Sequence, residues 1–239
     1  MQVIVTSYRR LKYLKQTVES LRQDPVELYI VDGGSDPETT KWIRQNADGW
    51  LMFQNNPGAD FLKTEGIKKF ATEREFILTS DDLLFPKGYS ELIWQNYTRL
   101  NANYPKIEWT YCACNMPHQR IAESSYRMIN GVKCLPAAVS QVAGAIIDTE
   151  IAHRVGYFPN YGKTGQGDFA FNRRLEAIGI QRCYWRNPTI IHIGADKPVD
   201  YPELHAMYVA DKKEHMVHGR RDDGVLMDPG EQSPELGWR

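Results

Sequence analysis

The sequence predicts an α/β fold whose central sheet is mostly parallel. Four short apolar runs, each typical of a strand, alternate with helical patterns in the first 80 residues. Strands and helices that alternate in this way form βαβ units, in which the strands run parallel. The second half differs, because its apolar runs are shorter and a loop rich in Gly, Tyr and Pro separates them over residues 156–167.

The expected elements of the first half follow in order. Leucine and valine recur at helical spacing over 11–22, which predicts an amphipathic helix after the first strand. Pro37, preceded by Asp36 or Ser35, marks the start of the next helix. Pro86 marks a turn before a further helix. The predicted strands are Val3–Val5, Leu28–Val31, Trp50–Phe53 and Phe76–Leu78, and the other predicted helices cover residues 66–70 and 92–100.

The second half predicts shorter elements and a polar end. Gly179 stops a helix that begins at Asp168, and the final stretch Arg220–Arg239 is typical of a mobile tail. The predicted strands are residues 109–113, Ala143–Ile147, Arg182–Trp185 and Thr189–Ile193. Three helices are predicted: a short one that ends near Val155, one over Asp168–Ile178 and one over Glu203–His215.

Composition excludes several classes of protein. The chain has 239 residues, 42% of them hydrophobic, which suits one large or two small domains. A net charge of −1 argues against a broad electrostatic surface for nucleic acid or an anionic membrane. We expect no signal peptide and no membrane span. The four cysteines lack the spacing of a zinc site, so we expect buried free thiols and a cytoplasmic protein.

Polar residues follow each of the four predicted strands. Ligands of an open parallel sheet bind beyond the carboxyl ends of its strands, so these residues are expected to line one cleft. Tyr8 could stack on a planar base, and Asp32 could accept a hydrogen bond from a ring N–H or a ribose hydroxyl. No glycine-rich phosphate loop is present, so a metal and basic side chains must hold any phosphates. The cleft residues are Thr6, Ser7, Tyr8, Asp32, Gly33, Asn55, Asn56, Ser80, Asp81 and Asp82.

Two adjacent carboxylates, Asp81 and Asp82, follow the apolar run Phe76–Leu78. Two like charges side by side repel each other, so a strand gains no stability from ending in them. A divalent cation between them and a substrate phosphate would explain the pair, and oxygen ligands suit Mg²⁺ or Mn²⁺. The alternative is that the pair caps the next helix without any metal.

Five segments together resemble the inverting family 2 glycosyltransferases, and most closely their spore-coat polysaccharide type. These segments are Val3–Arg10, Ile30–Asp36, Asn56–Ile67, Thr79–Asp82 and Gly167–Gly179. The resemblance implies the GT-A fold, an α/β fold with a mostly parallel central sheet flanked by helices and a smaller antiparallel part on the acceptor side. It also implies one catalytic domain over 1–196, divided into a nucleotide-sugar half (1–100) and an acceptor half (101–196), before a helical extension and polar tail over 197–239.

The chain departs from the family's motifs at four positions. Gly33 stands in place of a second aspartate, which shifts the expected base contact towards Asp32. Lys63 replaces an arginine and so keeps the charge but loses the bidentate fork. Thr79 and Gly167 each replace a carboxylate of the family's Asp-x-Asp and Glu-Asp motifs.

The resemblance implies transfer of a sugar from a nucleoside-diphosphate sugar to an acceptor hydroxyl. Asp168 is the expected general base, although an aspartate at a helix start is also a favoured N-cap. Asp82, Asp81 and His192 are the candidate ligands of Mn²⁺ or Mg²⁺, and a satisfied core histidine is the alternative for His192. The candidate nucleotide-binding residues are Thr6, Ser7, Tyr8, Arg10, Asp32, Lys63 and Asp81.

The arrangement of Tyr8 and Asp32 resembles uridine-binding members, so we expect a UDP-sugar, with TDP- and GDP-sugars as alternatives. Lys63 is expected beside the phosphates, and an exposed helix lysine is the other interpretation. The acceptor is expected to be a glycan or another hydroxyl compound. A basic cluster at Lys212, Lys213, Arg220 and Arg221 would allow a nucleic-acid acceptor, to which the overall charge gives little support.

Two other functions compete with this interpretation. A nucleotidyltransferase also uses acidic metal ligands, but it needs a glycine-rich basic loop, and Arg9 and Arg10 follow the first strand without such glycines. A non-catalytic module that binds nucleotide sugars would explain the two missing carboxylates. Metal-dependent release of UDP from a UDP-sugar separates the enzyme from the binding module.

Overall fold

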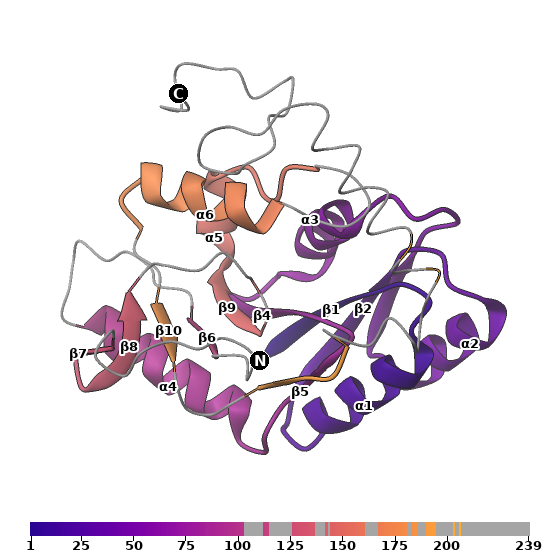
Figure 1. Cartoon of the computed structure of the whole chain (residues 1–239), viewed down its shortest axis with the longest axis horizontal. Coiled ribbons are helices and arrows are strands. Elements are labelled where there is room, and N and C mark those ends of the chain that lie inside the picture. Colours follow the sequence, from indigo (N-terminus) through magenta and orange to yellow (C-terminus); the bar gives the residue numbers. More distant parts are fainter. Residues whose placement is uncertain are drawn as a thin grey trace.

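The fold comprises a central sheet between two layers of helices, with a smaller sheet at one end (Figure 1). A computed structural model of the chain describes residues 1–102, 112–114, 126–136, 142, 144–160, 167–180, 183–185, 190–194, 203 and 206. One hydrophobic core joins the two halves of the chain, from Val3 on the first strand to Ile190 near the last. The predicted α/β fold is therefore confirmed.

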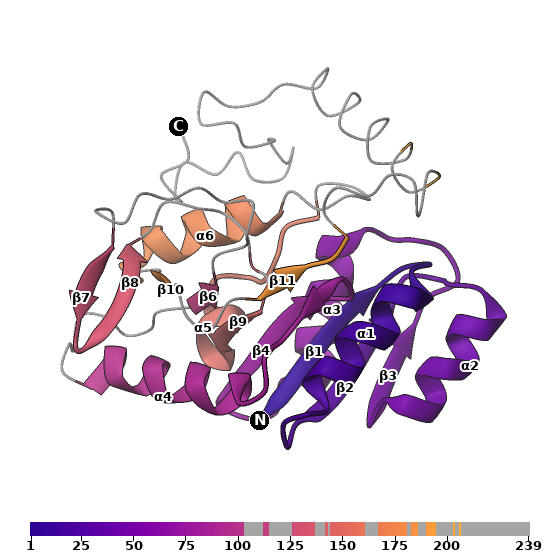
Figure 2. The same ribbon diagram turned by 60° about the horizontal axis from the view of Figure 1, so that its bottom comes forward.

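The central sheet has five strands in the order β3-β2-β1-β4-β9 (Figure 2). Its strands are β1 (Gln2–Ser7), β2 (Glu27–Asp32), β3 (Gly49–Met52), β4 (Glu75–Ser80) and β9 (Ala145–Asp148). The first four are parallel, as predicted, and β9 lies antiparallel to β4. Ser7 is level with Asp32, and Thr6 is level with Ser80. The polar residues that follow β1, β2 and β4 therefore meet at one edge.

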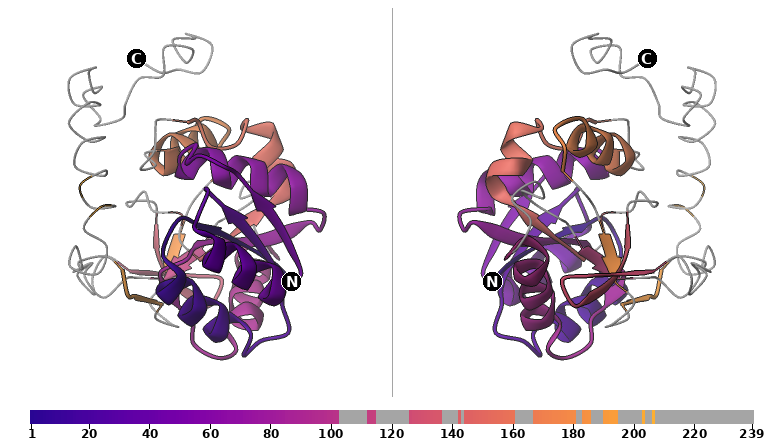
Figure 3. Two further views of the ribbon diagram at one scale, coloured as in Figure 1. Left: turned by 90° about the vertical axis from the view of Figure 1, so that its right-hand side faces the viewer. Right: turned by 90° about the vertical axis from the view of Figure 1, so that its left-hand side faces the viewer.

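Helices cover both faces of this sheet, with α3 and α6 on one face and α1 and α4 on the other (Figures 1 and 3). The helices are α1 (Leu11–Leu21), α2 (Pro37–Asn46), α3 (Ala59–Phe70), α4 (Tyr89–Ala102), α5 (Thr149–Arg154) and α6 (Gly167–Ala177). Asp36, and not Ser35, caps α2 by accepting from the Thr39 amide. Gly66 lets α3 approach the sheet, because a Cβ there would lie 2.8 Å from a methyl group of Val31.

The smaller sheet has the order β6-β10-β8-β7 and is mixed. Its strands are β6 (Cys112–Cys114), β7 (Arg127–Ile129), β8 (Val132–Pro136) and β10 (Cys183–Trp185). The β7–β8 and β8–β10 pairs are antiparallel, as the resemblance implies, but β6 runs parallel to β10. The β7–β8 hairpin was not predicted. Its turn, Asn130-Gly131, has positive φ at both residues and is a common hairpin sequence that could have revealed it.

A separate ribbon of two short strands pairs the segment around His192 with the segment that follows β4. The strand β5 (Leu83–Leu84) pairs antiparallel with β11 (Ile191–His192), so that His192 lies opposite Leu83. The amide of Ile193 donates to the carbonyl of Asp82 at 2.9 Å. This pairing brings a segment that is distant in sequence to the carboxyl edge of the sheet.

Several predictions lie largely outside the described residues. The predicted helix over Glu203–His215 is seen only at Glu203 and Ala206, which are helical. The tail Arg220–Arg239 and the basic cluster lie outside the described residues, and the proposed boundaries at residues 100 and 196 stay predictions. In the part of the chain that the structure describes, no helix combines the length and the apolar character that a bilayer span requires.

Candidate active site

The turn after β1 directs Arg10 towards the sheet edge. Arg9 adopts a left-handed conformation with φ of 55°, and Arg10 takes the N-cap position of α1. The Arg10 carbonyl accepts from the amide of Leu14 at 2.9 Å, but its side chain makes no capping bond. The guanidinium instead reaches the carboxylates that follow β4.

Asp81 and Asp82 form a buried acid pair around that guanidinium, with exposed fractions of 0% and 4%. Arg10 Nη2 donates to Asp81 Oδ1, and its Nη1 donates to Asp82 Oδ2 at 2.6 Å. Ser7 Oγ donates to Asp81 at 2.9 Å, and Ser80 Oγ donates to Asp82 at 2.6 Å. The strand β5 follows directly, and α4 begins several residues later. The pair therefore does not cap a helix.

Burial and the neighbouring charges act against each other in this pair. Burial raises the pKa of Asp81 to about 6, although Arg10 opposes it. Burial also acts to raise the pKa of Asp82, but Arg10 and His192 outweigh it and hold that pKa below its usual value. Burial would lower the pKa of Arg10, yet attraction to both carboxylates raises it. Two carboxylates thus share one guanidinium, which leaves negative charge for a further cation to balance.

His192 lies beside the acid pair, where the sequence placed it. Its Nε2 is 3.0 Å from Asp82 Oδ2, and its side chain is 18% exposed. The contact is a hydrogen bond, as expected of a satisfied core histidine. Its length also equals the separation of about 3 Å between neighbouring ligands of an octahedral ion at 2.0–2.1 Å, so the two atoms could share a cation. Arg10 contacts the same oxygen. No three Asp, Glu, His or Cys side chains of the described residues gather as a ligand set. Water and diphosphate oxygens would have to complete the coordination.

Gly194 is required by the packing of Asp82. A Cβ at this position would lie 2.6 Å from Asp82 Oδ2 and 2.8 Å from its Cβ, closer than real contacts allow. The absence of a side chain at Gly194 therefore lets β11 close over the acid pair. The sequence analysis did not single out this glycine, because its partner is 112 positions earlier in the chain.

Three side chains expected to contact the nucleotide already form hydrogen bonds to other groups of the protein. Asp32 is 1% exposed, and its carboxylate accepts from the amides of Gly34 and Ser35 at 3.1 and 2.8 Å and from Ser35 Oγ at 2.6 Å. Thr6 Oγ1 donates to a backbone carbonyl of β4 at 3.4 Å, and Ser7 donates to the acid pair. These side chains hold the loops at the edge, and their contact with a nucleotide stays a prediction.

Tyr8 is half-buried at this edge, with the Arg9 guanidinium 5.2 Å from its ring centroid. A Cβ at Gly33 would lie 3.3 Å from the Tyr8 ring, 3.3 Å from Asn56 Oδ1 and 3.1 Å from Leu62. An aspartate at position 33 would therefore crowd Tyr8. The departure from the family motif at Gly33 fits this packing, and the ring of Tyr8 keeps its place at the expected base position.

A second charged cluster joins α3 to α6. Lys63 is ion-paired with Asp168 and lies 3.3 Å from Asp60 Oδ1. Burial would lower the pKa of Lys63, but the two carboxylates outweigh it and raise that pKa. Asp168 Oδ2 also accepts from the amide of Val142 at 2.8 Å. Lys63 is only 12% exposed, so it is not a solvated helix lysine.

The Asp168 side chain points away from the amides of its own helix. Asp168 is the second residue of α6, and its two oxygens accept from Lys63 and from the Val142 amide, so it is not the N-cap of that helix. The side chain remains 22% exposed. The structure pairs Lys63 with this carboxylate and not with Asp81 or Asp82, and the phosphate contact expected of Lys63 stays a prediction.

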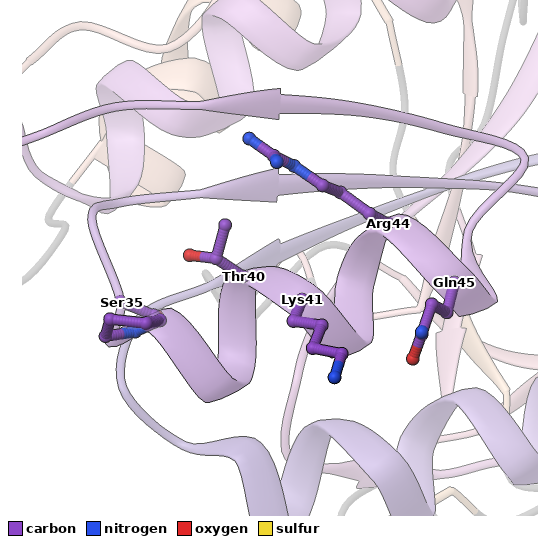
Figure 4. Close-up of a pocket in the computed structure, with 6 residues that line it drawn as sticks. Ser35, Thr40, Lys41, Arg44 and Gln45 are labelled. Carbon is purple, nitrogen blue, oxygen red and sulfur yellow. The ribbon is translucent and has the colours of Figure 1, made fainter.

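One open pocket of about 570 Å³ lies along α2, apart from both clusters. Figure 4 shows Thr40 and Arg44 on one side of the helix and Lys41 on the other. Ser35 connects the pocket to the loop after β2. Among the described residues lining this pocket there is no carboxylate.

The chain is similar to known proteins in part of its sequence and in its fold. The sequence model of glycosyl transferase family 2 matches residues 2–103. A search of curated protein sequences finds no match. Among solved structures, TarS of S. aureus, residues 1–349, is 15% identical with a TM-score of 0.59, over 88% of this chain and 64% of that one. The same fragment with UDP-GlcNAc is 14% identical with a TM-score of 0.60, over 88% and 65%.

The chain thus spans less than two thirds of those TarS fragments, and 39% of the longer TarS structure. At such low identity the likeness establishes the fold, which is GT-A. The sequence match covers the part of the chain that carries β1 to α4 and the acid pair. Residues 2–103 are therefore similar to glycosyl transferase family 2, and the chain as a whole has the GT-A fold.

Proposed function

We propose that this protein transfers a sugar, with inversion, from a UDP-sugar to the hydroxyl of a glycan or similar acceptor. The observation that carries the proposal is the buried acid pair at the carboxyl edge of a parallel sheet, with His192 Nε2 3.0 Å from Asp82. The TarS structures of similar fold include complexes with UDP-GlcNAc and with UDP, which supports the choice of nucleotide. Within the family, the spore-coat polysaccharide type remains our assignment.

The donor side is built on the acid pair. Asp82 and His192 would hold Mn²⁺ or Mg²⁺, with Asp81 beside them and the diphosphate as a further ligand. When bound, the cation neutralises the charge that develops on the leaving diphosphate. Arg10 adds a positive charge at the same place. Tyr8 stacks on the base, while Asp32 keeps the neighbouring loop in shape.

The acceptor side is built on Asp168. Its carboxylate takes the proton of the acceptor hydroxyl as that oxygen bonds to the anomeric carbon and the bond from this carbon to the diphosphate oxygen breaks. Lys63 and the Val142 amide each occupy one lone pair, and each carboxylate oxygen keeps another for the proton. The ammonium of Lys63 contacts this carboxylate and helps to orient it.

We expect UDP to bind in the presence of Mn²⁺ and to bind more weakly after chelation. Isothermal titration of UDP, GDP, TDP and CDP, each with Mn²⁺ and with EDTA, measures both preferences. Slow Mn²⁺-dependent release of UDP from UDP-GlcNAc or another UDP-sugar should accompany binding. Tight binding of GDP without any signal from UDP would refute the uridine choice. Binding of UDP without any hydrolysis in a screen of UDP-sugars would favour the non-catalytic module.

Gly194→Ala should abolish the stabilisation that Mn²⁺ and UDP give to the protein. The added methyl would meet Asp82 Oδ2 at 2.6 Å and displace the proposed ligand. Thermal unfolding with and without Mn²⁺ and UDP provides the measurement, because a ligand of the native state raises the melting temperature. Gly131→Ala is the control: its φ of 77° strains any side chain and lowers the melting temperature, but a Cβ in that remote turn meets nothing within 4 Å, so the response to ligand should persist. An unchanged ligand response in Gly194→Ala would argue against Asp82 as a metal ligand.

A further inference from the structure

Asp60 is a carboxylate with no solvent exposure in the first turn of α3. Aspartate is rarely buried to this degree unless it is paired. Its Oδ1 lies 3.3 Å from Lys63 Nζ, and its Oδ2 accepts from the amide of Gly167 at 2.8 Å. Both partners adjoin Asp168, since Gly167 precedes it and Lys63 is ion-paired with it.

The packing of α3 against α6 leaves room for Asp60 because residue 167 is a glycine. A Cβ on Gly167 would lie 2.6 Å from Asp60 Cγ and 2.7 Å from the carbonyl of Pro159. The carboxylate therefore fills space that a side chain at position 167 would need. It also satisfies a helix-terminal amide, one of the groups that α6 cannot pair internally.

Phe158 forms a second set of contacts between α3 and α6. Thr64 Oγ1 donates to the carbonyl of Phe158 at 3.0 Å and accepts from its amide at 3.2 Å. The Phe158 ring stacks on Phe171 of α6, with centroids 4.2 Å apart. Polar contacts of Asp60 and Thr64, together with the aromatic packing, thus hold the start of α6 against α3. A shift of the Asp60 side chain would move Gly167 or Lys63, and each of these adjoins Asp168.

Burial of the charged Asp60 side chain is energetically unfavourable. Burial raises its pKa despite the nearby Lys63, because a charged group loses its hydration there. An asparagine would keep the shape and could still accept from the Gly167 amide. The feature that only the charged carboxylate adds is its attraction for Lys63, which lies between the two carboxylates.

We propose that Asp60 is a positioning residue for the general base: it orients the start of α6 through Gly167 and holds Lys63 where the ammonium meets Asp168. The inference rests on the proposed function, because it assigns Asp60 to the same transfer step. Asp60 itself is buried and does not touch the acceptor or the donor. Its effect reaches the reacting atoms through the direction of the Asp168 carboxylate.

Asp60→Asn should lower kcat by about 10–100-fold, because a displacement of about 1 Å at a reacting group costs up to 10²-fold. The Kd for UDP with Mn²⁺ should stay within about twofold, since the donor site is built from other residues. Asp148→Asn is the matched control. Asp148 is also a buried carboxylate, 7% exposed, that caps a helix, and it lies level with Glu75 at the opposite edge of the sheet. Its variant should keep the parental kcat.

A double-mutant cycle separates positioning from general damage. The rate of UDP release is measured for the parent, Asp60→Asn, Asp168→Asn and the double variant, with the UDP-sugar that the parent hydrolyses fastest in the screen. If Asp60 acts through Asp168, adding Asp60→Asn to Asp168→Asn leaves the residual rate unchanged. An equal loss in both backgrounds, or a parental kcat in Asp60→Asn, would overturn the inference.

If Asp60→Asn does not fold, Lys63→Gln takes its place in the same cycle. Its neutral amide can still donate to Asp60 but no longer supplies the charge. We expect the same loss of kcat and the same lack of effect in the Asp168→Asn background. An inactive parent, or parental turnover in Asp168→Asn, contradicts the proposed function and the inference with it. If Asp168→Asn loses turnover while Asp60→Asn and Lys63→Gln keep the parental rate, only the inference is contradicted.

Discussion

Asp168→Asn is expected to slow sugar transfer by about 10²–10⁴-fold, the usual contribution of a general base. Asparagine has the same shape and its amide oxygen can still accept from the Val142 amide, which the carboxylate now binds at 2.8 Å. A neutral amide cannot take a proton from the acceptor hydroxyl. The fold should therefore survive while the chemical step fails.

The measurement pairs turnover with binding. Release of UDP from UDP-GlcNAc reports the chemistry, and isothermal titration with UDP and Mn²⁺ reports the donor site. UDP affinity should be unchanged, because the residues proposed to hold the donor lie at the ends of β1, β4 and β11 and not on α6. Asp24→Asn is the control, since Asp24 accepts from amides at the start of α4 at 2.7 and 2.8 Å. Turnover of Asp168→Asn within a few-fold of the parent would exclude it as the base.

The parallel part of the fold could be read from the sequence because its signals are local. Each strand from β1 to β4 is an apolar run, and each ends in polar residues that the parallel register brings to one edge. The cap at Asp36 is local too, because the bond to the Thr39 amide spans three residues. Local patterns of this kind predict the element and the end of the strand at which polar residues gather, and these predictions are confirmed.

The side-chain partners at the site could not be predicted in the same way. Asp168 meets Lys63 across 105 positions, and Arg10 meets Asp81 across 71. Such contacts depend on how α3 packs on α6 and on the left-handed turn at Arg9. The sequence identified Asp168, Lys63 and Arg10 as functional candidates, but it assigned Lys63 to the phosphates. The ion pair with Asp168 follows only from the packing of the two helices.

The two-residue strand β5 was not predicted from the sequence. The strand β5 contains only Leu83 and Leu84, and its pairing with β11 is set by its distant partner. The resemblance suggested His192 as a ligand from its strand end, and the structure places it beside Asp82. The need for glycine at 194 arises from the same close approach and carries no local signal.

Arg10→Met should destabilise the protein by about 3 kcal/mol at neutral pH, because removing one partner of a buried ion pair leaves an uncompensated charge. Asp81 and Asp82 would keep their burial but lose their common guanidinium. Arg22→Met provides the matched control. Its ion pair with Asp48 at 2.9 Å is exposed, with side-chain fractions of 36% and 45%. An exposed pair contributes about 1 kcal/mol or less.

Urea unfolding at pH 7 and pH 5 tests the cause of the loss. Without Arg10 the folded acid pair binds protons more readily than in the parent, so the variant is relatively less destabilised at low pH. In the parent, Asp81 with its pKa raised to about 6 already takes up a proton between these two values. The difference in unfolding free energy between Arg10→Met and the parent should therefore be smaller at pH 5 than at pH 7, whereas the difference for Arg22→Met should change little.

Mn²⁺ provides a second test. Because a cation bound at the acid pair would replace the missing guanidinium, Mn²⁺ should restore stability to Arg10→Met and not to Arg22→Met. Equal responses of the two variants to pH and to Mn²⁺ would mean that the acid pair neither requires Arg10 nor accepts a cation in its place.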